Sequence, residues 1–184
     1  MKTRITCLLA MAVLVGCSAA QREGAGPAGK MKEFIAGVQL FEGLSSAEMD
    51  QVAALCTQTE YPRGAHVIRT GEPVKHLYVI WDGKADVLVN GRAVATLGPN
   101  GLLGEMSFVD GQPPSADVVM VTDGKLILID RAGLQRVMDE QPRLGLKVMR
   151  NMAAILSQKL HQMNQQATRS AILVPTSPPP TPMP

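Results

Sequence analysis

The chain has 184 residues and a formal net charge of +2, from 18 basic and 16 acidic side chains. This length fits one domain with extensions at its ends. The charge is nearly balanced, and no basic stripe with interleaved aromatic residues is visible, which argues against a nucleic-acid-binding protein. We therefore expect an ordinary globular protein with one modest core.

Residues 1–16 have the pattern of a secretory signal peptide. Lys2 and Arg4 precede an apolar run from Cys7 to Val15, and small residues follow it. The run is about half of the roughly 20 residues that a membrane-spanning helix needs. The pattern therefore predicts export and cleavage rather than a membrane span.

The sequence Leu-Val-Gly-Cys at positions 14–17 resembles the lipobox of bacterial lipoprotein signals. In that family the chain is cut before the cysteine and the cysteine is acylated, so the resemblance implies that Cys17 anchors the protein in a lipid membrane. Each buried CH₂ of an acyl chain contributes about 0.8 kcal/mol, which makes such anchoring effectively permanent. The alternatives are a plain cleaved signal with a coincidental cysteine, or an uncleaved short anchor. Ser18 after the cysteine favours the outer membrane, so the expected location is the periplasmic face of that membrane in a bacterial cell envelope.

Two further segments are expected to lie outside the folded domain. Residues 17–30, which include the lipidated cysteine, are rich in Gly, Ala and Pro and read as a flexible tether that reaches on the order of 20 Å. Residues 168–184 end in VPTSPPPTPMP, whose prolines lack donors and fix φ. A disordered tail is expected there, with a polyproline ligand for a partner as the alternative.

Cysteine usage agrees with this picture. If Cys7 is removed and Cys17 is acylated, only Cys56 remains, which excludes an intramolecular disulfide. Cys56 lies in a stretch with helical apolar spacing, so a buried structural thiol is the expected role.

The folded domain is expected over residues 31–167. Helical spacing runs from Phe34 to Cys56, and Ser45-Ser46 ahead of Glu48 marks the N-cap of a second helix. Short β-branched segments then predict strands that close into a barrel or sandwich. The segments are AHVIRT, HLYVIW, KADVLV, RAVATL, ADVVMV and KLILID, and the expected hairpin turns are Asp82-Gly83, Asn90-Gly91 and Asp123-Gly124. Helical spacing returns in RAGLQRVMDE and in a long helix over about 143–167.

The long helix carries two apolar stripes. The first has the three- and four-residue steps of a coiled-coil seam and the second could dock on the barrel. Either a partner copy covers the seam, so that residues 143–167 form a homodimer contact, or one wide stripe is buried within the chain. The seam is Leu146, Met149, Ala153, Leu156, Leu160 and Met163, and the docking stripe is Leu144, Val148, Met152 and Ile155.

The stretch GEPVKHLYVIWDGKADV, ahead of LLGEMSFVDGQPPSADV, resembles the cyclic nucleotide-binding domain family. The resemblance covers about residues 34–163 and rests on Gly71-Glu72, Leu77 to Ile80, Gly83 and Gly104-Glu105-Met106. It implies a mainly β fold, a jelly-roll β-barrel of about eight antiparallel strands flanked by N-terminal helices and a long C-terminal helix.

The resemblance also implies a ligand site, with cyclic AMP or cyclic GMP as the ligand. Glu105 would accept a hydrogen bond from the ribose 2′-hydroxyl, the amides of about 106–108 would face the cyclic phosphate, and Ser115 would add a bond. The family's phosphate-binding arginine is expected nine residues after the glutamate, where this chain has Pro114. Such a loss costs on the order of 2–5 kcal/mol, so affinity should fall at least tens-fold. The implied site residues are Gly104, Glu105, Met106, Ser107, Ser115 and Ala116.

Two roles in this site have alternatives. A different cation could replace the arginine, and the candidates are Arg92, Arg143 and Lys159, although a solvated position is the expected one for Lys159. Glu105 could instead bond loop amides and hold the cassette shape.

The other function classes fit less well. The only histidines, His66, His76 and His161, form no metal-binding pair, and no nucleophile with a base is recognisable, so neither an enzyme nor a metal site is expected. About twenty residues follow the long helix, too few for a helix-turn-helix. The sequence thus predicts a membrane-anchored binding or sensor module that needs no cofactor and binds a cyclic nucleotide or another small anion. The alternative is a vestigial pocket in a structural or dimerisation module of the cell envelope.

Overall fold

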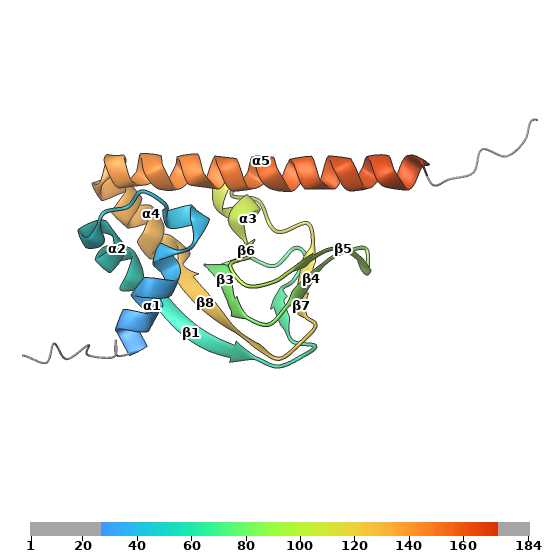
Figure 1. The fold of residues 1–184 in the computed structure, drawn as a ribbon, viewed down its shortest axis with the longest axis horizontal. Helices are drawn as coiled ribbons and strands as arrows, with labels where there is room; N and C mark the ends of the chain where they lie inside the picture. Colours follow the sequence, from blue (N-terminus) through green and yellow to red (C-terminus); the bar gives the residue numbers. More distant parts are fainter. Residues whose placement is uncertain (1–26, 173–184) are drawn as a thin grey trace, which may run out of the picture.

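The computed structural model describes residues 27–172, in which helices at both ends of the domain flank a β-barrel (Figure 1). The long helix α5 runs straight along one side of the molecule, above the short helix α3 and beside the helices at the end of the barrel. The helices are α1 (Pro27–Ala36), η1 (Gln39–Phe41), α2 (Ser46–Ala53), α3 (Glu105–Asp110), α4 (Arg131–Glu140) and α5 (Pro142–Ile172).

Eight strands form two four-stranded antiparallel sheets, with the orders β1-β8-β3-β6 and β2-β7-β4-β5. The prediction of an eight-stranded jelly roll with flanking helices is therefore confirmed. The strands are β1 (Cys56–Tyr61), β2 (His66–Ile68), β3 (His76–Asp82), β4 (Ala85–Val89), β5 (Arg92–Leu97), β6 (Leu102–Leu103), β7 (Asp117–Met120) and β8 (Gly124–Asp130).

Strands β3 and β8 separate two parts of the hydrophobic core. Leu77 and Val79 of β3 face the helices, whereas Tyr78 and Ile80 face the barrel interior. Because both faces are covered, the two strands read as continuous apolar runs rather than as an alternation of apolar and polar residues. The helical layer, including α5, is thus packed on the outside of the sheet that also lines the barrel.

Two of the three expected hairpin turns are not hairpins. Only Asn90-Gly91 joins strands that pair with each other, β4 and β5. The strands on either side of Asp82-Gly83, and those on either side of Asp123-Gly124, lie in different sheets. The two turns lie against each other, since a Cβ on Gly83 would be 2.8 Å from the Asp123 carbonyl oxygen. Glycine is needed at this crossing for close packing and not to close a hairpin.

The sequence interpretation also missed strand β1 and misplaced Cys56. Helix α2 ends at Ala53, and Cys56 begins β1, which pairs with β8 over its whole length. Most of β1 is exposed and polar, so it lacks the alternation by which strands are recognised. The Cys56 thiol is half-buried and donates to the carbonyl oxygen of Val52 at 3.2 Å.

Cys56 is expected to react slowly with alkylating reagents. Burial raises the pKa of its thiol from 9.0 to about 12, so the thiolate fraction at neutral pH falls about a thousandfold. Peptide mass spectrometry after brief iodoacetamide treatment should find Cys56 largely unmodified in the native protein and fully modified after denaturation. Rapid modification of the native protein would show that the thiol is more accessible than its packing indicates.

The ends of the domain differ from the expected boundaries. Helix α1 begins at Pro27, inside the predicted tether, and α5 continues past residue 167 to Ile172, into the predicted tail. The signal peptide, Cys17 and the Pro-rich end lie outside the described residues. No helix within residues 27–172 is long and apolar enough to cross a membrane.

Helix α5 presents two distinct apolar faces, as the two-stripe interpretation predicted. Leu144, Val148, Met152 and Ile155 are buried in the core. On the other face, Leu146 is 71% exposed, Leu160 59% and Met163 60%. Of the seam residues, Leu156 still packs against the core, so the seam is exposed at its two ends and partly covered by the domain in between.

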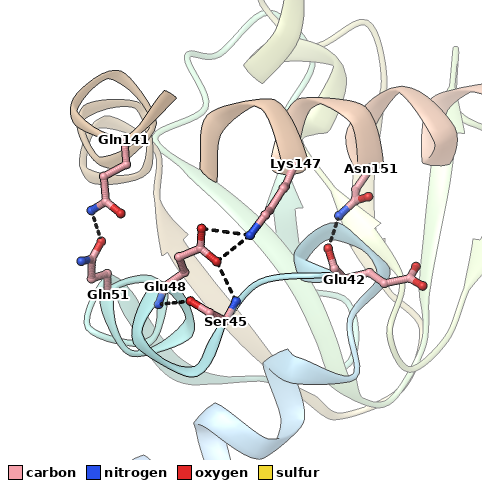
Figure 2. A network of polar contacts seen from close by, with 7 residues as sticks. All are labelled: Glu42, Ser45, Glu48, Gln51, Gln141, Lys147 and Asn151. Carbon is pink, nitrogen blue, oxygen red and sulfur yellow. Dashed lines mark hydrogen bonds and ion pairs between the residues drawn. The ribbon is translucent and has the colours of Figure 1, made fainter. Parts of the chain in front are cut away.

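The first turns of α5 are fastened to the N-terminal helices by polar contacts. Figure 2 shows Lys147 against the Glu48 carboxylate, at 3.0 Å and 2.8 Å, and Asn151 reaching the Glu42 carbonyl oxygen at 2.9 Å. Glu48 also completes the predicted capping box with Ser45, which begins α2. The ion pair thus links α2 to the first turns of α5.

Glu48 should make stability depend on pH in the acid range. Its bonds to Lys147 and Ser45 lower the pKa of the carboxyl group from 4.5 to about 2. A carboxyl group with a lowered folded-state pKa stabilises the fold above its unfolded pKa, and this contribution is lost as the pH falls from 4.5 towards 2. Urea unfolding at about pH 6 and about pH 3 should show a smaller loss of stability in Glu48→Gln than in the wild type.

The matched control for this measurement is Glu33→Gln, which changes an exposed carboxyl group on α1. It should keep the wild-type dependence on pH. If Glu48→Gln keeps that dependence as well, the contact with Lys147 does not form in solution.

Candidate functional site

The predicted cassette lies between β6 and β7, where the chain forms α3. Gly104, the residue before the helix, has a φ of 83°, and a Cβ there would lie 3.1 Å from the His76 carbonyl oxygen. Both the left-handed backbone and the lack of space require glycine at this position. Glu105 and Ser107 then point into the domain and are buried, whereas Met106 is exposed.

The Glu105 carboxylate is paired with a cation from the long helix. Lys159 Nζ lies 2.7 Å from Glu105 Oε1, and it also donates to the carbonyl oxygen of Leu102 at 2.7 Å. The expectation that Lys159 is solvated was therefore wrong. So was the alternative in which loop amides hold Glu105, because the hydrogen-bond partner found for its carboxylate among the described residues is this lysine.

Glu105 is more deeply buried than its partner Lys159. The Glu105 side chain is 6% exposed and that of Lys159 is 28% exposed. A buried carboxylate without a partner is costly, so the ion pair stabilises the cassette as it stands. The lysine side chain is partly open to solvent, whereas the glutamate side chain is enclosed.

The loop that should supply the phosphate contacts lies against the segment after β2. The carbonyl oxygen of Pro114 accepts from Gly71 N–H at 2.9 Å, and Asp117 Oδ1 accepts from Thr70 N–H at 2.7 Å. That bond lowers the pKa of the Asp117 carboxyl group. Ser115 is exposed and Ala116 is half-buried. The loop is thus fixed by its backbone, and the Pro114 position carries no charge.

The three basic residues that could replace the missing arginine lie at different distances from the cassette. Arg92 is exposed on β5, and Arg143 is exposed in the first turn of α5. Since a helix rises 1.5 Å per residue, Arg143 lies about 24 Å along α5 from Lys159. Of the three candidates, only Lys159 is brought to the cassette.

A further basic residue, Arg131, was missed by the sequence interpretation. Its guanidinium lies 5.8 Å from the centroid of the Phe108 ring of α3, and its NH1 donates to the Val74 carbonyl oxygen at 3.4 Å. The side chain therefore connects the start of α4 to the cassette helix. In the sequence it sits at the start of an ordinary amphipathic helix, so no local signal marked it.

Metal binding has no support in this region. No group of three or more His, Cys, Asp or Glu side chains within residues 27–172 is placed to hold a metal ion.

Two four-stranded sheets, with a short helix inserted between β6 and β7 and a long helix closing over it, define a jelly-roll domain with a single cassette. Residues 58–141 match the family model described as "Cyclic nucleotide-binding domain". The match supports a cyclic nucleotide-binding domain in this part of the chain, as the resemblance implied.

Three known proteins illustrate the relationship. The chain is 33% identical over 122 residues to glutaminase 1 of Bradyrhizobium diazoefficiens, covering 66% of this chain and 20% of the glutaminase. It is 28% identical over 142 residues to the CRP-like cAMP-activated global transcriptional regulator of Mycobacterium tuberculosis, covering 73% of this chain and 60% of the regulator. A cyclic nucleotide-binding domain from Methylobacillus flagellatus superposes with a TM-score of 0.68 at 23% identity, covering 77% of this chain and 82% of that domain.

The chain spans about a fifth of the glutaminase and less than two thirds of the regulator. The shared part is the binding domain, which occurs in proteins with different activities. The family is typically regulatory or binding rather than catalytic.

Proposed function

We propose that this chain is a membrane-anchored sensor or binding module that takes a cyclic nucleotide or a similar small anion and has neither catalytic nor DNA-binding activity. The observation that carries the proposal is the cassette. Its glycine has the required left-handed backbone, and its glutamate is held buried beside the long helix. The match of residues 58–141 to the family supports the same ligand class.

Calorimetric titration of the soluble chain, from Ser18 onward, tests the proposal. We expect saturable binding of cyclic AMP or cyclic GMP in the micromolar range, because the anion lacks its arginine. Glu105→Ala should abolish it, whereas Glu33→Ala, which removes an exposed carboxylate on α1, should leave it unchanged. Absence of heat with both nucleotides would contradict the proposed ligand class.

The membrane anchor is a separate part of the proposal and rests on the lipobox-like Leu-Val-Gly-Cys at positions 14–17. Metabolic labelling with a fatty acid in a bacterial host should mark the wild-type chain and not Cys17→Ser. If both chains are processed alike and neither is labelled, Cys17 is not acylated, and the proposed location at the membrane is wrong.

A second candidate function is a protein-interaction module that pairs through α5. The exposed seam favours it, because four large apolar side chains on one helix face are in water in the single chain. In a parallel pair, the charged residues that flank the seam, Arg150 and Lys159, do not oppose each other across the interface. The occupant we propose is therefore a second copy of this chain.

Sedimentation equilibrium of the soluble chain tests this pairing. A dimer should form and should dissociate in Leu160→Asp, because the substitution buries a charge in the seam. The control Gln158→Asp places the same charge on an exposed position outside the seam and should leave the dimer intact. A monomer at all concentrations would exclude the second candidate.

A further inference from the structure

The ligand-accepting carboxylate already has a partner in this chain. Lys159 Nζ holds Glu105 Oε1 and the Leu102 carbonyl oxygen, both at 2.7 Å. A ligand hydroxyl that bonds to the same oxygen, Oε1, would compete with the ammonium group for it. Since Glu105 is buried, it cannot turn outward to meet the ligand elsewhere. Binding must therefore displace the ammonium group or share the carboxylate with it.

Displacement of the lysine is physically reasonable. Its ammonium group ends a flexible four-carbon stem, and more than a quarter of the side chain is already exposed. When it leaves, water can solvate it, and the hydroxyl of the ligand can replace it as a donor to the carboxylate. The exchange keeps Glu105 hydrogen-bonded in both states, which avoids the high cost of an unpaired buried charge.

Lys159 also makes the hydrogen bond furthest along α5 among those that the described side chains of this helix form with the rest of the domain. The side-chain hydrogen bonds that α5 makes to other elements within residues 27–172 come from Lys147, Asn151 and Lys159. The first two fasten the start of the helix. Lys159 follows Ile155 by one turn, at the end of the buried stripe, and the next residue is the exposed Leu160.

We propose that Lys159 is an affinity-determining residue that competes with the ligand for Glu105, so that ligand binding releases the part of α5 beyond Ile155. The inference rests on the proposed function, since it assumes that a ligand hydroxyl is read by Glu105. It adds a second reason to expect a low affinity, because the acceptor at Glu105 is occupied and the charge at Pro114 is missing.

The first test compares the affinities for cyclic AMP in a chain that carries Pro114→Arg, so that a variant with weakened binding can still be measured. Adding Lys159→Met should tighten binding about tenfold, as expected when a site that is competent about one tenth of the time becomes always competent. Lys147→Met, which removes the other lysine that ties α5 to the domain, is the matched control and should leave the affinity unchanged.

The second test needs no ligand and uses hydrogen exchange of the otherwise unmodified chain. Lys159→Met and Glu105→Gln should each speed exchange several-fold in residues 156–165 and leave residues 144–152 unchanged, because the start of α5 keeps its own contacts. The two variants differ in the first test, where only the lysine variant should bind more tightly. Glu105→Gln also carries no unpaired charge, so this part of the test survives if Lys159→Met does not fold.

The outcomes separate the inference from the proposed function. If the wild type, Pro114→Arg and the double variant all fail to bind cyclic AMP, the proposed function fails and the inference fails with it. If Pro114→Arg binds and Lys159→Met leaves that affinity unchanged or weakens it, the inference alone is overturned. Unchanged exchange in both single variants would overturn the release of α5.

Discussion

Pro114→Arg is expected to tighten the binding of cyclic AMP at least tens-fold. The substitution adds a guanidinium group at the position where the family resemblance places the phosphate partner. A charge-assisted contact to a buried anion contributes on the order of 2–5 kcal/mol, which corresponds to tens-fold or more in affinity. The backbone of the loop should not change, because the Pro114 carbonyl oxygen that accepts from Gly71 N–H is kept.

Calorimetry on the soluble chain gives the two dissociation constants. Pro113→Arg is the matched control, because it places the same charge on the neighbouring exposed residue of the loop. It should raise the affinity no more than a general surface charge does, about twofold to threefold. An equal gain from both variants would show that the phosphate is not bound at a defined place. No gain from either would show that residue 114 does not reach the bound phosphate. Absence of binding in all three chains would leave the pairing of α5 as the main candidate function.

The layout of the domain could be predicted because its apolar patterns are local. The alternation in AHVIRT and the dense runs in HLYVIW and KLILID each determine a strand without reference to the rest of the chain. The sequence did not reveal strands β1 and β6, for two different reasons. β1 is an exposed polar edge strand, and β6 is only the two residues Leu102–Leu103. Neither offers enough periodic residues for a pattern to form.

The path of the chain between the sheets could not be predicted from the turns. An Asp-Gly pair indicates a tight turn, and it does so whether the next strand joins the same sheet or the opposite one. In this domain, Asp82-Gly83 and Asp123-Gly124 cross between sheets, and their glycines pack directly against each other. That contact joins residues about forty positions apart, which no local pattern records.

The candidate site was predicted in part. The glycine and glutamate of the cassette were identified from their motif, but the partner of Glu105 was not. A signal for Lys159 was present, since the residue stands one helical turn after Ile155 on the buried stripe. Periodicity shows that such a side chain faces the domain, and it does not show what lies opposite. The identity of the partner depends on how α5 crosses the barrel, which is a property of the folded chain.

Met152→Ala is expected to lower the free energy of unfolding by about 2–5 kcal/mol, a large part of the stability of a domain of this size. Met152 is fully buried at the centre of the docking stripe, between Val148 and Ile155. Truncation removes apolar contacts and leaves a cavity that a helix fixed at its start by Lys147 and Asn151 cannot close by moving. Urea unfolding of the soluble chain measures the change.

Met163→Ala is the control that separates packing from helix propensity, because it makes the same exchange on the same helix. Met163 is 60% exposed on the seam, so a single chain should lose at most about 0.5 kcal/mol. Equal losses at both positions, at a concentration where the chain is monomeric, would mean that the two faces of α5 are not distinct. A loss at Met163 that grows with protein concentration has a different meaning, since only a partner copy on the seam makes stability depend on association.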